Sequence, residues 1–459
     1  MKKNLSVLVC LVLALLLFAS SAMADYQVNT TLDQSKEVTL NVFGPGVFSV
    51  GPEDVTDLVS GLTKPGFNVI INRWNELYPN IKLVIEYSGW DSWQANITAA
   101  CLEGNVDIIM HGATMVDLTE DLAPYVQGDP EYADQIYALA SRRTTNNIQE
   151  YKVSGISLSL SPAVAIIDKQ IFADYGVELP TKDWTYDTLL ELAAKLTGTD
   201  PVTGEQTYGY QMWASGANNL WMNYVQAANS VGAKIYKYGT SVKDTVVDYK
   251  SPEAIKGWEI LRDLAKFCSP ESLEGVGVTE VLNGTNNWAV LCKEGPISLH
   301  FEAKAAGLSD RYMFLNMPLC TEGEYKGLPT PHAGDNNMAI YKDSDAKEWA
   351  WEFIKFMNTD PVATQWVIDG MNWPNNKAGK ELAISLIGEE LASTMDFCLS
   401  SLPLNYNNAT NDVFNNVSFG ATTNAQITAV SNVINGYMTP EEAAQYMQDY
   451  VDSYVTSLQ

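Results

Sequence analysis

Histidine is scarce in this sequence, and positive charge is in short supply. The 459 residues include 3 His, and 28 Lys and Arg stand against 55 Asp and Glu, which gives a formal net charge of −27. A chain this acidic repels phosphate backbones, anionic membrane surfaces and polyanionic ligands. We therefore expect no nucleic-acid partner.

The motifs of common catalytic centres are missing as well. The sequence contains no Gly-x-Ser-x-Gly, no His-rich metal motif and no phosphate-binding glycine loop. Acidic residues are numerous, yet no two of them stand out as the carboxylate pair of a glycosidase. The sequence thus predicts no catalytic residue, no metal site and no cofactor, and we expect that the protein is not an enzyme.

Cysteines are few, and none shows Cys-x-x-Cys spacing. Cys101 shares an apolar helix face with Trp93 and Ile97, which predicts a buried free thiol. One disulfide remains an alternative in an oxidising compartment, and the sequence does not choose its pair. The candidates for it are Cys268, Cys292, Cys320 and Cys398.

The first residues have the features of an export signal. Lys2 and Lys3 precede an apolar run, residues 5–18, and Ala22-Met23-Ala24 has the small residues of a cleavage site. The run is shorter than the ~20 residues of a membrane span. Cys10 lies inside the run rather than after it, unlike a lipid attachment site. We expect a signal peptide, residues 1–24, cleaved after Ala24, and a periplasmic protein; a secreted or cell-surface location is the alternative.

Strand and helix patterns alternate in the next hundred residues. Strands are predicted over 38–43, 81–87 and 106–110, and helices over 67–78 and 91–103. This order is typical of a parallel sheet covered by helices. Ligands of such sheets bind beyond the carboxyl ends of the strands. We therefore place Phe43, Trp90 and His111 at one rim.

The stretch from Pro162 to Tyr210 is the most informative. An apolar run ends at Asp168, breakers follow at Gly176 and Pro180, and Thr185 caps a helix predicted over 186–196. This order resembles the family 1 extracellular solute-binding proteins, the sugar-capturing subunits of bacterial ATP-driven importers. In that family the run usually has two tyrosines before Asn-Lys. Here Ile166, Ile167 and Asp168 stand in those places.

The resemblance extends over nearly all of the mature chain, in order. Further segments that carry it are 38–44, 67–79, Asp107, 296–302, 328–340 and 372–374. It implies a two-lobed α/β periplasmic-binding-protein fold, each lobe a mostly parallel sheet flanked by helices, joined by a hinge. We expect residues 25–155 and 333–370 in lobe 1 and residues 156–332 and 371–459 in lobe 2. The chain would then cross near 155–160, 330–335 and 371.

The resemblance also implies a function. A monomeric protein would capture a mono- or oligosaccharide between its lobes and deliver it to the membrane permease of an ABC importer. Sugars need aromatic faces and a few polar groups. The residues expected to bind the ligand are Phe43, Trp90, His111, Trp213, Asn218, Trp221, Glu302, Asp335, Asn372 and Trp373.

Trp90, Trp221 and Trp373 are expected to offer accessible faces, so replacing Trp90 or Trp373 by Ala should weaken binding without lowering stability. By contrast, helical tryptophans on packing faces, such as Trp74 and Trp258, are predicted to be structural. Two alternatives stay open. One is a secreted carbohydrate-active enzyme, and the other is the same fold with a polyamine or a peptide as its ligand.

Overall fold

The structure is a computed structural model that describes residues 25–45, 51–56, 63–88, 93–143, 151–213, 217–237, 246–274, 282, 284–402 and 421–457. The expected signal peptide and Trp90 lie outside these residues. Contacts divide the chain into two compact units. Unit 1 comprises the described residues up to Ala140 with Val153–Leu160 and Asp335–Ala392; unit 2 comprises those of Ser141–Lys152, Ser161–Gly334 and Ser393–Gln459.

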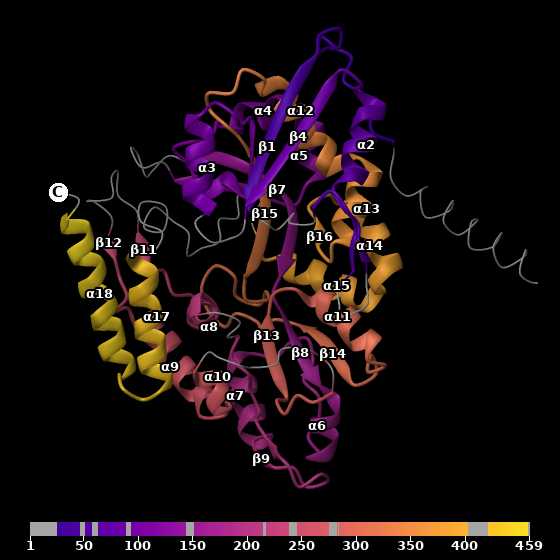
Figure 1. Ribbon diagram of the computed structural model, residues 1–459. Coiled ribbons are helices and arrows are strands. Elements are labelled where there is room, and N and C mark those ends of the chain that lie inside the picture. The colour runs from indigo at the N-terminus through magenta and orange to yellow at the C-terminus, as the bar shows by residue number, and fades with distance from the viewer. Residues whose placement is uncertain are drawn as a thin grey trace, which may run out of the picture. The chain divides into compact units, whose positions relative to one another are not determined.

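Unit 1 is built on one mixed sheet (Figure 1). β1 pairs in parallel with β4 on one side and with β5 on the other, as the sequence predicted, whereas β15 runs antiparallel to β5. The strand order is β16-β7-β15-β5-β1-β4, and β6 pairs with β7. The bounds are β1 (Val38–Pro45), β4 (Ile81–Ser88), β5 (Ile108–Met110), β6 (Leu139–Arg143), β7 (Tyr151–Pro162), β15 (Ala333–Ile340) and β16 (Trp373–Pro374).

Helices cover both faces of this sheet, which the burial pattern of β5 makes clear. Ile108 and Met110 belong to a core with Trp74 and Phe353, whereas Ile109 between them packs with Trp93 on the other face. Successive side chains of a strand point to opposite faces of the sheet, so apolar residues at three successive positions show that both faces of β5 are buried. The first core lies under α2 (Asn68–Leu77), α12 (Lys347–Thr359) and α13 (Pro361–Asp369), and the second lies under α3 (Trp93–Leu102).

Unit 2 has a three-stranded sheet that differs from the expectation. β8 (Val164–Asp168) lies between β13 (Val290–Lys293) and β14 (Tyr312–Asn316), and both neighbours run antiparallel to it. Parallel pairing beside it, in the described residues, consists of two single bridges, Tyr208 with Trp288 and Gln211 with Leu291 of β13. The prediction of a mostly parallel sheet is therefore wrong for this unit. Periodicity predicts that a segment is a strand, but it carries no information on the strand's direction.

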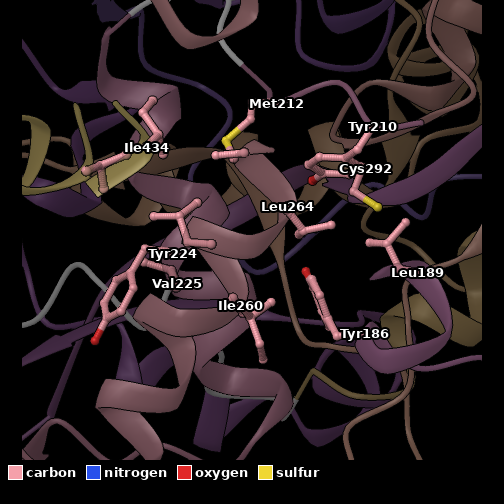
Figure 2. Packing of buried hydrophobic residues seen from close by; sticks show 14 of the residues in the cluster. Tyr186, Leu189, Tyr210, Met212, Tyr224, Val225, Ile260, Leu264, Cys292 and Ile434 are labelled. Atoms are coloured by element: carbon pink, nitrogen blue, oxygen red, sulfur yellow. The ribbon is translucent and has the colours of Figure 1, made fainter. Parts of the chain in front are cut away.

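The core of unit 2 is formed by helices packed on that sheet. α8 packs on α9, and α17 and α18 pack on each other and on α9 (Figure 1). Tyr210 and Cys292 from the sheet side meet Tyr224 and Leu264 from the helices in one apolar cluster (Figure 2). The bounds are α6 (Lys169–Asp174), α7 (Tyr186–Lys195), α8 (Ala217–Ser230), α9 (Pro252–Ala265), α10 (Pro270–Glu274), α11 (Pro296–Ala305), α17 (Ala421–Ile434) and α18 (Pro440–Ser457).

Shorter elements complete the described part of the chain. They are β2 (Val55–Thr56), β3 (Thr63–Lys64), η2 (Gly112–Thr114), α4 (Ala123–Gly128), α5 (Pro130–Gln135), β9 (Gly198–Thr199), β10 (Gln206–Thr207), β11 (Tyr236–Lys237), β12 (Val246–Val247), α14 (Gly379–Ile387) and α15 (Glu389–Leu399). The boundary between the units falls inside β6, β7, β15 and α15, after Ala140, Lys152, Leu160, Gly334 and Ala392. The crossing expected near 371 is therefore wrong, because β16 pairs with β7 of unit 1 and keeps residues 371–392 there.

The helix cap predicted at Thr185 is confirmed. Thr185 and Thr188 form a reciprocal capping box at the start of α7.

Each of the five cysteines in the described chain is a buried free thiol, so Cys101 is as predicted and the alternative of a disulfide is wrong for this structure. Within the described residues, no helix is both long enough and apolar enough to cross a membrane.

Candidate functional site

The predicted rim of unit 1 lies where β1 and β5 end. Phe43 pairs in register with Ile109, and a β-carbon on Gly44 would lie 2.4 Å from Cβ of Met110. His111 follows β5 directly, and its backbone N–H donates to the carbonyl of Asn337 on β15. Three strands therefore bring Phe43, His111 and the first residues of β15 to the same edge of the sheet.

A row of polar side chains lines this edge. Asp335 accepts hydrogen bonds from Ser157 Oγ at 3.3 Å and from Asn337 Nδ2 at 3.0 Å. Asn336 Nδ2 donates to Ser159 Oγ at 2.8 Å and to Asn372 Oδ1 at 3.3 Å. Asp335, Asn336 and Asn372 are each only half-buried. The row therefore holds amide and carboxylate groups in fixed positions and leaves them within reach of hydroxyl groups.

The backbone is strained at both ends of this row. Among the described residues, His111 with φ 59° and Met371 with φ 64° are the non-glycine residues in the left-handed region. Such a conformation costs of the order of 1–3 kcal/mol and persists at ligand-binding sites more often than elsewhere. His111 is a predicted ligand residue, and Met371 directly precedes Asn372.

Aromatic side chains flank the rim on the α3 side of the sheet. The His111 ring meets the Trp93 ring edge to face, with centroids 5.5 Å apart. Phe43 is half-buried and packs against the same cluster of Trp93 and Ile97. The rim thus combines ring surface on one side with the polar row on the other.

Trp373 is in the right part of the sheet but is not accessible. It pairs with Leu160 of β7 and is among the largest fully buried side chains. The expectation that its removal leaves stability unchanged is therefore wrong, because a side chain enclosed on all sides contributes packing. Its Nε1 is buried and has no hydrogen-bond partner in the described part of the chain. A buried donor without a partner is uncommon in folded chains.

In unit 2, the predicted residue Trp213 belongs to a defined cluster. Its backbone N–H donates to Asn223 Oδ1 at 3.2 Å, and its carbonyl accepts from Asn223 Nδ2 at 3.0 Å. Its ring meets the ring of His332 edge to face at 5.7 Å. Nε2 of His332 in turn lies 2.7 Å from Oε1 of Glu294. A tryptophan, a histidine and a carboxylate are thus held together in this unit.

Three other predicted residues of unit 2 have different outcomes. Trp221 lies in the core of the unit and packs at tilted angles against the rings of Tyr224 and Trp258, so the expectation of an accessible face is wrong. The reason is that residues 217–230 form a helix, which turns Trp221 inward. Glu302 is half-buried and lies on helix α11 rather than after a strand. Asn218 lies in the first turn of α8, and its side chain is outside the described part.

Sequence reasoning missed Glu294 and His332. Two signals were available: Glu294 comes directly after a buried strand and before Gly295-Pro296, and His332 is one of 3 His in the chain. In the described residues, no group of three or more His, Cys, Asp or Glu is arranged to hold a metal ion. The side chains of the two clusters offer hydrogen bonds and ring faces.

Two compact α/β units with polar and aromatic edges define a binding protein of the two-lobed kind. The chain matches the family model of the bacterial extracellular solute-binding proteins over residues 60–364. More than half of its length is covered, and the protein belongs to this family. The α/β solute-binding fold predicted from the sequence is thereby confirmed.

Solved structures of similar fold agree. An ABC substrate-binding protein from Listeria monocytogenes in complex with cycloalternan is 18% identical, covers 92% of this chain and 100% of its own, and has a TM-score of 0.64. A solute-binding protein from Thermotoga lettingae bound to α-D-tagatose is 18% identical over 92% and 100%, with a TM-score of 0.61. The sugar-binding protein MalE from Xanthomonas citri is 12% identical over 92% and 98%, with a TM-score of 0.68.

Proposed function

We propose that this protein captures a neutral mono- or oligosaccharide between its two lobes and delivers it to the membrane permease of an ABC importer. It does so as an exported, non-catalytic monomer, and the lobes close around the ligand by a hinge motion. Membership in the solute-binding family supports the general role. The sugars bound by the Listeria and Thermotoga proteins of similar fold support the ligand class.

The observation that carries the proposal is the strained, polar rim of unit 1. His111 and Met371 adopt left-handed backbone conformations at its two ends. Between them, Asp335, Asn336 and Asn372 present oxygen and amide groups that suit hydroxyls. A sugar also presents flat C–H faces, which an aromatic ring such as that of Phe43, half-buried at the same rim, can cover.

A panel of neutral saccharides tests the proposal. The processed chain is mixed with each sugar, and unfolding temperature and titration calorimetry report binding. At least one sugar should raise the unfolding temperature, since a ligand that binds only the folded state stabilises it. A response to spermidine or to a peptide and to no saccharide would contradict the ligand class. Sugar release by pure protein would contradict the non-catalytic role.

Two substitutions tie that binding to the rim. Asn372→Ala removes a partner of Asn336 and should weaken sugar binding at least several-fold, because a site built to bond hydroxyls loses one group. The matched control is Asn80→Ala, an exposed asparagine at the amino end of β4, which should leave the affinity unchanged. Equal effects of the two changes would place the ligand elsewhere.

A further inference from the structure

A buried carboxylate in unit 1 fixes the first residues of the expected mature chain. Glu352 on α12 is 1% exposed. Its Oε1 accepts hydrogen bonds from the hydroxyls of Tyr26 and of Tyr78, the latter at 2.8 Å. Its Oε2 accepts from Asn29 Nδ2 at 3.0 Å and lies 3.3 Å from Nζ of Lys355. Two of these four partners come from residues 26 and 29.

Other contacts fix the same segment. The backbone N–H of Asn29 donates to the hydroxyl of Tyr78 at 2.8 Å, and the Tyr26 ring meets the Phe356 ring edge to face at 5.6 Å. Burial, together with the charge of Glu352, raises the pKa of Tyr26 far above its ordinary value, so this hydroxyl stays a donor. Asp25 precedes Tyr26 directly, so its backbone is confined to the same part of unit 1.

A cavity of about 460 Å³ lies beside this segment. Four of its described lining residues are acidic, among them Asp25 itself, and one, Lys355, is a cation. Lys355 is already placed between Asp129, at 3.4 Å, and Glu352. The lining residues are Asp25, Tyr26, Gln27, Asn29, Asp129, Glu131, Tyr132, Gln135, Glu352, Lys355 and Thr359.

One lining residue has an unused polar group. The Tyr132 side chain is 3% exposed, and its hydroxyl has no hydrogen-bond partner among the residues the structure describes. A buried hydroxyl without a partner is unfavourable, and it is one of the features that point to a missing ligand or ion. With an excess of carboxylates around it, this cavity suits a cationic hydrogen-bond donor.

We propose that this cavity binds the free amino terminus of the processed chain. Hydrolysis of the Ala24–Asp25 peptide bond leaves a carboxylate on Ala24 and an amine on Asp25, which is protonated at neutral pH. The resulting ammonium carries three donors and pairs with Asp129 and Glu131 in the cavity. The site therefore becomes complete only when the signal peptide is removed. This inference depends on the expected cleavage and not on which ligand the protein transports.

The pKa of the Asp25 α-amino group tests this proposal. The chain that starts at Asp25 is labelled by reductive methylation with ¹³C-formaldehyde, and the NMR signal of the labelled amine is titrated. The carboxylates of Asp25, Asp129, Glu131 and Glu352 favour the charged form, and Lys355 opposes it. The pKa should therefore lie above the roughly 7.7–8.0 of an ordinary α-amino group.

Two variants provide matched comparisons. Glu131→Gln should lower the pKa of the amine towards its ordinary value. Glu389→Gln also removes an exposed acid from the first turn of a helix in unit 1, and it should leave the pKa unchanged. A chain that keeps Ala24 replaces the Asp25 ammonium by an amide and should unfold at a lower temperature at pH 7. Because binding raises the pKa, this difference should be full below about pH 7.7 and disappear as the pH rises through the folded-state pKa.

Several results would overturn the proposal. They are a mature amino terminus at another residue in the exported protein, an ordinary α-amino pKa, or equal unfolding temperatures for the chains with and without Ala24. If spermidine binds at this cavity, and Glu131→Gln weakens that binding while the α-amino pKa stays ordinary, the site belongs to an external cation instead. Saccharide binding is measured in parallel and does not depend on any of these outcomes.

Discussion

Glu294 Oε1 lies 2.7 Å from Nε2 of His332, and this contact places a carboxylate that is 21% exposed against a ring that is 1% exposed. The backbone of Gly334 makes the contact possible. A β-carbon added there would lie 2.4 Å from Glu294 Oε2, closer than real β-carbons approach other atoms. Glycine at position 334 therefore leaves room for the carboxylate that pairs with His332.

Gly334→Ala should displace the Glu294 carboxylate and separate it from His332. We expect a loss of about 0.5–1.5 kcal/mol in the free energy of unfolding, the usual net contribution of one polar contact, because the added β-carbon meets only the end of a flexible side chain. Denaturant unfolding measures this loss. In a Glu294→Ala background the same glycine change should be much less harmful, because the clash and the contact are both gone. Gly128→Ala, where an added β-carbon meets open space, is the control. Additive effects of the two changes at 294 and 334 would contradict the assignment.

Trp373→Ala should lower the free energy of unfolding by about 3–5 kcal/mol, the usual range for removing a fully buried large ring. Trp373→Phe keeps a ring but removes the Nε1 donor, so it should lose clearly less stability. If the ligand accepts a hydrogen bond from Nε1, the Phe variant should still lose affinity. Parallel denaturant and calorimetric titrations separate the two effects. An Ala variant as stable as the natural chain would show that Trp373 does not contribute packing.

The part of the fold that the sequence predicted best is the start of unit 1. Strand and helix periods are regular there, and β1, α2, β4, α3 and β5 all form within a few residues of their predicted limits. Residues 297–303 were harder. Ile297, Leu299 and Phe301 alternate with polar residues as in a strand, yet they form helix α11. Gly295 in a left-handed conformation, followed by Pro296 at the first helical position, is the stronger signal.

The candidate site was predicted in part, for a physical reason. Residues that follow a strand, such as His111, can be placed because a sheet aligns the ends of its strands. The accessibility of a tryptophan depends on what packs over it, which only the folded chain decides. For Trp221, however, the burial could have been predicted from the sequence. It shares a helical face with Tyr224, Val225 and Ala228, and this spacing was visible in the sequence.

Cysteine ionisation should make the folded chain sensitive to alkaline pH. Burial raises the pKa of Cys101 from 9.0 to about 11, with the charge of Asp343 as a smaller cause, and burial alone raises that of Cys320 to about 11. The unfolded chain loses these protons first, so their contribution is full below about pH 9 and disappears as the pH rises to 11. Unfolding temperatures should fall over this window.

At pH 8 the native thiols should resist iodoacetamide, whereas Ser385→Cys, on an exposed position of α14, should react at once. Rapid alkylation of the natural chain would contradict the burial.

Asp168→Asn should destabilise unit 2, because it removes a buried charge and one hydrogen-bond acceptor. The Asp168 carboxylate is fully buried, accepts two hydrogen bonds from Nε of Arg311 at 2.9 and 3.0 Å, and lies 2.7 Å from its Nη2. It also caps helix α6 by accepting from the backbone N–H of Gln170, and asparagine caps as well as aspartate does. The substitution can therefore keep the cap, but it removes the charge that pairs with Arg311. Its NH2 group also replaces the oxygen that accepts from Asn286 Nδ2 at 3.0 Å. Breaking a buried pair in this way usually costs about 3–5 kcal/mol, and we expect the lower end because Arg311 is 24% exposed.

The control is Glu259→Gln, which breaks a surface pair with Lys256 and should cost less than about 1 kcal/mol. If both variants unfold at the same denaturant concentration as the natural chain, the Asp168–Arg311 pair does not stabilise the fold.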